Sequence, residues 1–168
     1  MQEGLFPQYD PVRPDYFVAT SFRPDFPASA ANDLDETTFW VSGKKPGWGQ
    51  RLEVQFHPNA VNIAKIGIFA GDPVGQMLVP KRLVLSFYRW VNPSTTGWVP
   101  TDNPFNPRAG WAFAGQKQLT LRNEPGLQRF DADAQNVGRV VLTILDTYRG
   151  QNPKAAAAIT ELEFFAKG

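Results

Sequence analysis

Short stretches in which apolar and polar residues alternate recur along the whole chain, and this alternation restricts the fold more than any other feature. In RLEVQF, for example, Leu52, Val54 and Phe56 alternate with polar residues. Side chains two positions apart lie on the same face of a β-strand, so the stretch predicts a strand with one buried face. The same reasoning predicts strands in KRLVLSFYRW, VNIAKIGIF, KQLTLR, YFVATS and TTFWVS.

Two further stretches near the C-terminus add detail about strand position. In GRVVLTILDTY, Val140, Leu142 and Ile144 share one face, and Val141 makes the other face apolar as well, which is typical of a central strand. In TELEFF, Leu162 and Phe164 are expected to face the core, with Glu161 and Glu163 on the outer face.

The sequence between these stretches is rich in turn formers and poor in helical pattern. PN, GDPVG, NPSTTG, NEPG and RGQNP separate the strands, and the chain holds 14 Gly and 15 Pro. No apolar stripe with a helical period extends beyond two turns, and AAAA at 155–158 is too short to form a helix alone. We therefore predict an all-β fold, an antiparallel β-sandwich of the jelly-roll type, in one domain over residues 15–168 after an extended lead-in at 1–14.

Charge and composition exclude several functions. Lys and Arg total 17 against 16 Asp and Glu, which disfavours nucleic-acid binding. Cysteine is absent, so disulfides and thiolate zinc sites are excluded. No apolar run is long enough to span a bilayer, and the N-terminus has no signal-peptide pattern.

Motifs for catalysis are also missing, and we expect no enzymatic activity. The single histidine, His57, lies at a strand end before Pro58, and neither G-x-S-x-G nor a P-loop occurs. Asp33-x-Asp35 is similar to the start of an EF-hand, but the glycine and the final glutamate of that loop are absent. The glycine-rich segment 43–49 is better explained as a hairpin turn than as a phosphate loop.

Taken in order, several segments resemble the galactose-binding-like β-sandwich of discoidin and coagulation-factor C-type domains, and within it the bacterial NADase-type glycan-binding domains. In FVATSFRPDFPASAANDLDETTFWVSG a small-residue run leads to an acidic loop, a Thr, an aromatic residue and Trp40. The other matching segments are GQRLEVQFHPNAVNIAKIGIF, VPKRLVLSF and GRVVLTILDTYRGQNPKAAAAITELEFF, so the resemblance runs over residues 16–165.

The resemblance implies a structural calcium or sodium ion between the acidic loop and the last strand. Oxygen ligands suit such hard cations. The implied ligands are the side chains of Asp33, Asp35, Thr38 and Glu161, with backbone oxygens of Ala30 and Thr160. Leu34 departs from the family, which often has Gly there; if that position needs a positive φ, Leu would strain the loop. The alternative is that Asp33 or Asp35 only caps a turn.

The resemblance also implies a non-catalytic carbohydrate-binding module, extracellular or associated with the cell envelope, with its site in aromatic-bearing loops at one end of the sandwich. Sugars stack on aromatic rings while polar groups bind their hydroxyls. Trp40 and Trp90 fall in strand patterns and are expected in the core. The ligand-binding candidates are Trp48, Trp98, Asn103, Phe105, Arg108, Trp111, Tyr148 and Arg149.

Two other roles remain open on the same fold. The long 91–110 segment could grip a protein partner, or its aromatic residues could dock on a membrane. The near-neutral net charge gives no help in binding anionic lipid, which disfavours the membrane role.

Overall fold

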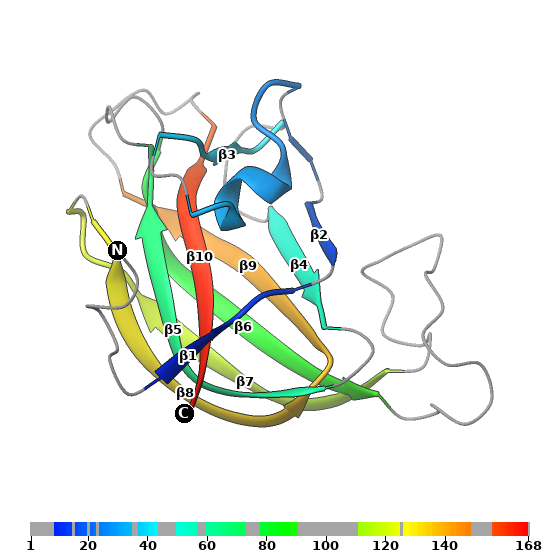
Figure 1. Ribbon diagram of the computed structural model, residues 1–168. Helices are drawn as coiled ribbons and strands as arrows, with labels where there is room; N and C mark the ends of the chain where they lie inside the picture. The colour runs from blue at the N-terminus through cyan, green and yellow to red at the C-terminus, as the bar shows by residue number, and fades with distance from the viewer. Residues whose placement is uncertain are drawn as a thin grey trace.

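The computed structural model describes residues 9–14, 16–19, 21–22, 24–34, 37–43, 50–56, 60–72, 78–90, 111–124, 126–148 and 156–167. These residues form a β-sandwich, as the alternation predicted, and the paired named strands are antiparallel (Figure 1). Among them, no helix has the length and apolar character that crossing a membrane requires.

The first sheet, sheet A, contains the two ends of the described chain. Its strands are β1 (Tyr9–Val12), β3 (Trp40–Val41), β5 (Val61–Ala70), β8 (Gln128–Val137) and β10 (Ala158–Lys167). The order is β1-β10-β5-β8, and β3 pairs with the beginning of β10. Part of the expected lead-in is thus an edge strand, since Tyr9–Val12 pair with the last residues of β10.

The second sheet, sheet B, lies behind the first in Figure 1. Its strands are β2 (Tyr16–Ala19), β4 (Arg51–Gln55), β6 (Pro80–Trp90), β7 (Trp111–Thr120) and β9 (Arg139–Thr147). The order is β2-β4-β9-β6-β7, so β9 is the central strand that its two apolar faces predicted.

The core fills the space between the sheets. The predicted inward residues of β4, β5, β6, β9 and β10 are buried in one apolar cluster, and Trp40 is buried with them. One short 3-10 helix, η1 (Ala28–Asn32), contributes Ala28 and Ala31 to that cluster and packs against β10, β2 and β3. The small side chains of η1 allow it to approach the strands closely. The sequence did not predict this helix.

Two features of the sheets differ from expectation. The strand β8 was not predicted, because its alternating inner residues Phe130, Ala132 and Ala134 are mostly small. The outer faces are also less solvated than the pattern indicated: Glu53, Glu161 and Glu163 lie on the faces opposite the core residues, as expected, yet each is buried.

Candidate functional site

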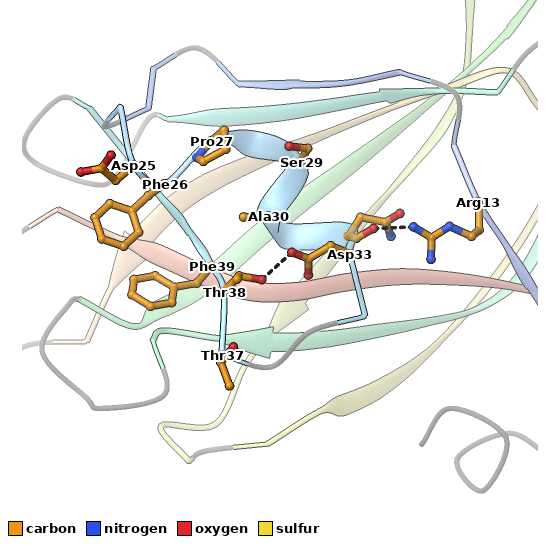
Figure 2. Close-up of a pocket in the computed structure, with 11 residues that line it drawn as sticks. Arg13, Asp25, Phe26, Pro27, Ser29, Ala30, Asp33, Thr37, Thr38 and Phe39 are labelled. Atoms are coloured by element: carbon orange, nitrogen blue, oxygen red, sulfur yellow. Dashed lines mark hydrogen bonds between the residues drawn. The ribbon is translucent and has the colours of Figure 1, made fainter.

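A pocket of about 530 Å³ opens beside η1, where the segment 25–39 passes over β10 (Figure 2). Volumes of this size are typical of small-molecule sites. The lining residues combine aromatic, hydroxyl and charged groups: Arg13, Asp25, Phe26, Pro27, Ser29, Ala30, Asn32, Asp33, Thr37, Thr38 and Phe39.

One end of the pocket has an aromatic wall. The rings of Phe26 and Phe39 stack with centroids 4.9 Å apart and planes inclined by 25°, and Asp25 lies next to them in Figure 2. Both rings are partly exposed and pack against a small buried cluster that includes Val41 and Ala158. The wall is therefore anchored to the sheet and still offers apolar surface to a ligand.

The other end is polar and is tied to the strands by hydrogen bonds. Arg13 donates from Nη2 to the carbonyl oxygen of Asn32 at 2.8 Å, and Asn32 donates from Nδ2 to the carbonyl oxygen of Leu162 at 2.6 Å. In the middle, Thr38 Oγ1 donates to Asp33 Oδ2 at 2.5 Å, as the dashed line in Figure 2 shows. These bonds hold Asn32 against β10 and Thr38 against Asp33.

A buried acidic group, Glu161, lies next to Asp33. Glu161 is 1% exposed, and within the described part of the chain neither of its carboxylate oxygens has a hydrogen-bond donor. Burial, followed by the neighbouring acids Asp33 and Glu163, raises its pKa from 4.5 to about 9. The carboxyl thus holds a proton at neutral pH unless a cation replaces it.

The remaining predicted metal ligands are Ala30, Thr160 and Asp35. Ala30 is buried in η1, and Thr160 precedes Glu161 on β10, with its hydroxyl donating to the carbonyl oxygen of Gly71 at 2.8 Å. Asp35 lies outside the described residues. Within the described ranges, no group of three or more His, Cys, Asp or Glu side chains is arranged as a metal site, so a cation here would need neutral oxygens as well as Asp33 and Glu161.

Leu34 adopts the backbone conformation that the glycine of the resembling family would favour. Its φ is 62°, in the left-handed region, and its side chain is about half exposed. The loop therefore keeps the turn that the substitution put in doubt, and the Cβ of Leu34 bears the strain.

Of the eight predicted sugar-binding residues, Trp111 and Tyr148 lie within the described part of the chain. Trp111 pairs with Trp90 at the C-terminal end of β6, whereas Tyr148 follows Thr147, the partner of Pro80 at the N-terminal end of β6. The Tyr148 hydroxyl donates to the carbonyl oxygen of Leu121 at 2.5 Å. The backbone positions of these two candidates lie at opposite ends of β6.

The other candidates Trp48, Trp98, Asn103, Phe105, Arg108 and Arg149 lie outside the described residues, and they stay predictions. Sequence reasoning missed the aromatic wall of the pocket, because Phe26 and Phe39 are far apart in sequence and no motif links them. The only available signal was that each aromatic residue flanks the acidic loop.

Similar folds occur among solved carbohydrate-binding modules. The family 32 module (CBM32) of NanJ from C. perfringens, solved in complex with galactose, matches with 17% identity and a TM-score of 0.62, over 89% of this chain and 92% of that one. The pair CBM32-1 and CBM32-2 of ZmpB from Clostridium perfringens, solved with GalNAc, matches with 14% identity and a TM-score of 0.68 over 99% of this chain and 38% of that one.

An F5/8 type C domain from Bacteroides fragilis matches with 14% identity and a TM-score of 0.62, over 95% of this chain and 97% of that one. No protein-family model and no curated protein matches the sequence. At these identities the matches establish the fold alone: the chain has the same β-sandwich fold as these CBM32 and F5/8 type C domains, as the resemblance in the sequence predicted. The finer resemblance to NADase-type glycan-binding domains stays a prediction.

Proposed function

We propose that the chain is a non-catalytic glycan-binding module. Modules of the same fold are solved with galactose and with GalNAc, which supports sugars as the ligand class. The module would serve outside the cell or at its envelope, where glycans are presented.

The observation that carries this proposal is the pocket beside η1. It pairs an apolar wall, Phe26 and Phe39, with the acceptor and donor groups of Asp25, Ser29 and Thr37. An aromatic face can take the C–H face of a sugar while a few polar groups fix its hydroxyls. Acidic groups at the rim favour neutral sugars, whose hydroxyls donate to carboxylates, over acidic sugars.

A glycan array with the whole chain tests this function. The variants are Phe39→Ala in the pocket, Trp98→Ala in the predicted loop, and Phe22→Ala as a matched control, since Phe22 is 53% exposed and lies outside the pocket lining. Binding should weaken about tenfold in Phe39→Ala, the loss of roughly 1.4 kcal/mol of stacking, and stay unchanged in Phe22→Ala.

Two other outcomes would change either the location of the sugar site or the proposed function. Loss of binding only in Trp98→Ala would move the site to the 91–110 segment while keeping the function. If the chain bound no neutral or acidic glycan, the proposed function would be wrong. The alternative, binding of a protein partner, would then be favoured.

We propose in addition that a calcium ion joins the acidic loop to β10. The buried oxygens of Glu161, which lack a donor within the described part of the chain, fit a hard cation, as do the carboxylate of Asp33 and the hydroxyl of Thr38. The backbone oxygens of Ala30 and Thr160 and the side chain of Asp35 would complete the set. The ion would neutralise buried acids and would take no part in chemistry.

Thermal unfolding with calcium or with a chelator tests the ion. At calcium a hundred times above Kd, linkage adds about 2.7 kcal/mol, so Tm should rise by roughly 5 to 10 °C. Glu161→Gln should lose this response, whereas Asp131→Asn, at a surface ion pair with Lys65, should keep it. An equal calcium response in Glu161→Gln would remove Glu161 from the ligand set.

A further inference from the structure

A row of aromatic and charged residues crosses the outer face of sheet B, far from the pocket. Arg139 pairs in register with Gln55 on one side and with Tyr88 on the other, and Tyr88 pairs with Phe113. Their neighbours Val54, Val140 and Phe87 are buried in the core cluster, so the row lies on the face turned away from the core.

Within this row the charges are paired and the rings are fixed. Glu53 Oε1 accepts from Arg139 Nε at 2.6 Å, and Gln55 Nε2 donates to Glu53 Oε2 at 2.7 Å. The guanidinium carbon of Arg139 lies 5.0 Å from the centre of the Tyr88 ring, close enough for a cation–π interaction. Arg139 and Glu53 are buried, so this arrangement has little freedom to move.

The outer end of the row is open to solvent. Phe113 is 56% exposed, more than any other large apolar side chain in the described ranges. Its ring meets that of Tyr88 edge-on, with centroids 5.8 Å apart and planes inclined by 74°. The Phe113 ring lies on the edge strand β7 and contacts Tyr88 on the neighbouring strand β6. A ring held in a fixed orientation costs little further entropy when a flat apolar ligand binds to it.

The residues next to Tyr88 and Phe113 indicate which kind of ligand fits. Ser86 pairs with Gln116 one step along the same face, next to the aromatic pair, and both carry neutral hydrogen-bonding groups. The charges of Arg139 and Glu53 neutralise each other and are buried, so the exposed groups beside them, Phe113 and Gln116, are aromatic and neutral. Ring stacking beside a hydroxyl and an amide suits a neutral sugar unit.

The row also adjoins the segment in which loop candidates were predicted. The pair Trp90 and Trp111 follows Tyr88 and Phe113 along the same ladder, and residues 91–110 connect these two strands. A sugar on Phe113 would therefore lie next to the strand ends from which that segment leaves the sheet.

We propose that Tyr88 and Phe113 form a second sugar-stacking surface, on the face of sheet B, with Arg139 as the positioning residue for Tyr88. This inference rests on the proposed glycan-binding function. It differs from the pocket in its strands and in its chemistry, since the residues named at its open end, Phe113, Ser86 and Gln116, are uncharged.

The test uses an array of neutral oligosaccharides, followed by calorimetric titration and aromatic NMR spectra with the best-binding one. Phe113→Ala should weaken binding by about five- to tenfold, and Phe113→Tyr should retain it. Leu145→Ala is the control, because Leu145 is also exposed and also lies in sheet B. Titration should shift the ring signals of Tyr88 and Phe113.

Separate variants test whether Arg139 positions the Tyr88 ring. Tyr88→Phe should bind as the wild type, since it keeps the ring over Arg139, whereas Tyr88→Leu should weaken binding with Tm little changed. Arg139→Lys should shift the Tyr88 ring signals in the free protein and weaken binding.

Failures of the two proposals can be told apart. If the wild type binds a sugar and Phe113→Ala binds it equally well without shifts at Tyr88 or Phe113, this surface is wrong and the pocket stands. If Phe39→Ala keeps binding and Phe113→Ala loses it, the sheet surface is the main site. If no neutral oligosaccharide binds the wild type, both proposals fall.

Discussion

Two glutamates are buried to the same degree on the outer faces of the two sheets, and their surroundings are opposite. Glu53 on β4 has an arginine partner, Arg139, and an amide donor, Gln55. Glu161 on β10 has the acids Asp33 and Glu163 as its neighbours, and its oxygens have no donor within the described ranges. Burial raises the pKa of both carboxyls, but only Glu53 has a positive charge opposing that rise.

We call Glu53, Arg139 and Gln55 the complete cluster, because the carboxylate of Glu53 has both a cation and an amide donor. We call Glu161, Asp33 and Glu163 the incomplete cluster, because within the described ranges the oxygens of Glu161 have no donor. A buried carboxylate costs several kcal/mol unless a cation and hydrogen bonds satisfy it. Around Glu53 the fold provides both from its own strands. Around Glu161 the described residues provide carboxylates and no hydrogen-bond donor, so among them nothing balances a negative charge on Glu161, which a proton would remove or an ion from solution would balance.

Breaking the complete cluster should have the largest effect. Arg139→Met leaves Glu53 buried without its cation, and we expect a loss of about 3–5 kcal/mol in the free energy of unfolding, measured by urea denaturation. The double variant Glu53→Gln with Arg139→Met should recover much of this loss, since no charge remains. A single-variant loss below about 1 kcal/mol would mean that Glu53 does not depend on Arg139.

The incomplete cluster should respond to pH in the absence of calcium. Because folding raises the pKa of Glu161 from 4.5 to about 9, its neutral form stabilises the fold fully below pH 4.5, and this contribution is lost as pH rises through 9. Unfolding free energy should fall by up to roughly 1 kcal/mol per pH unit in that window, relative to Glu161→Gln. Parallel pH profiles for the two proteins would contradict this.

The smallest effect should come from the turn above Glu161. Leu34→Gly removes the cost of a left-handed Leu, about 1–2 kcal/mol, and adds the chain entropy of glycine, about 0.5–1 kcal/mol. A net gain of about 0.5–1 kcal/mol should appear in urea denaturation. Leu34→Ala keeps a Cβ and should show no gain; equal results for the two variants would exclude strain at this position.

Much of the fold followed from the sequence, for reasons that particular strands make plain. The alternation in β4, β9 and β10 gave the correct core faces, because a period of two assigns each side chain to one face. It could not show that Glu53 and Glu161 are covered, since what covers an outer face comes from elsewhere in the chain. The strand β8 was not predicted, because its alanines give only a weak alternation of apolar and polar residues.

The candidate site was less predictable. The resemblance named Asp33, Thr38 and Glu161, and the fold brings these three residues together, with Asp33 next to both others. The aromatic pair Phe26 and Phe39 exists only after the segment 25–39 folds back on itself. Likewise, the row from Gln55 to Phe113 depends on strand order, which no local pattern encodes.

The position of β10 has a consequence for how the domain acquires its structure. This strand is the last in the chain, yet it lies between β1 and β5 and anchors Asn32 through a hydrogen bond that spans 130 residues. Sheet A cannot close until β10 has been synthesised, so the edges of β1 and β5 that pair with β10 stay open until then. The pairing of β10 thus joins residues far apart in sequence, and such non-local contacts slow folding.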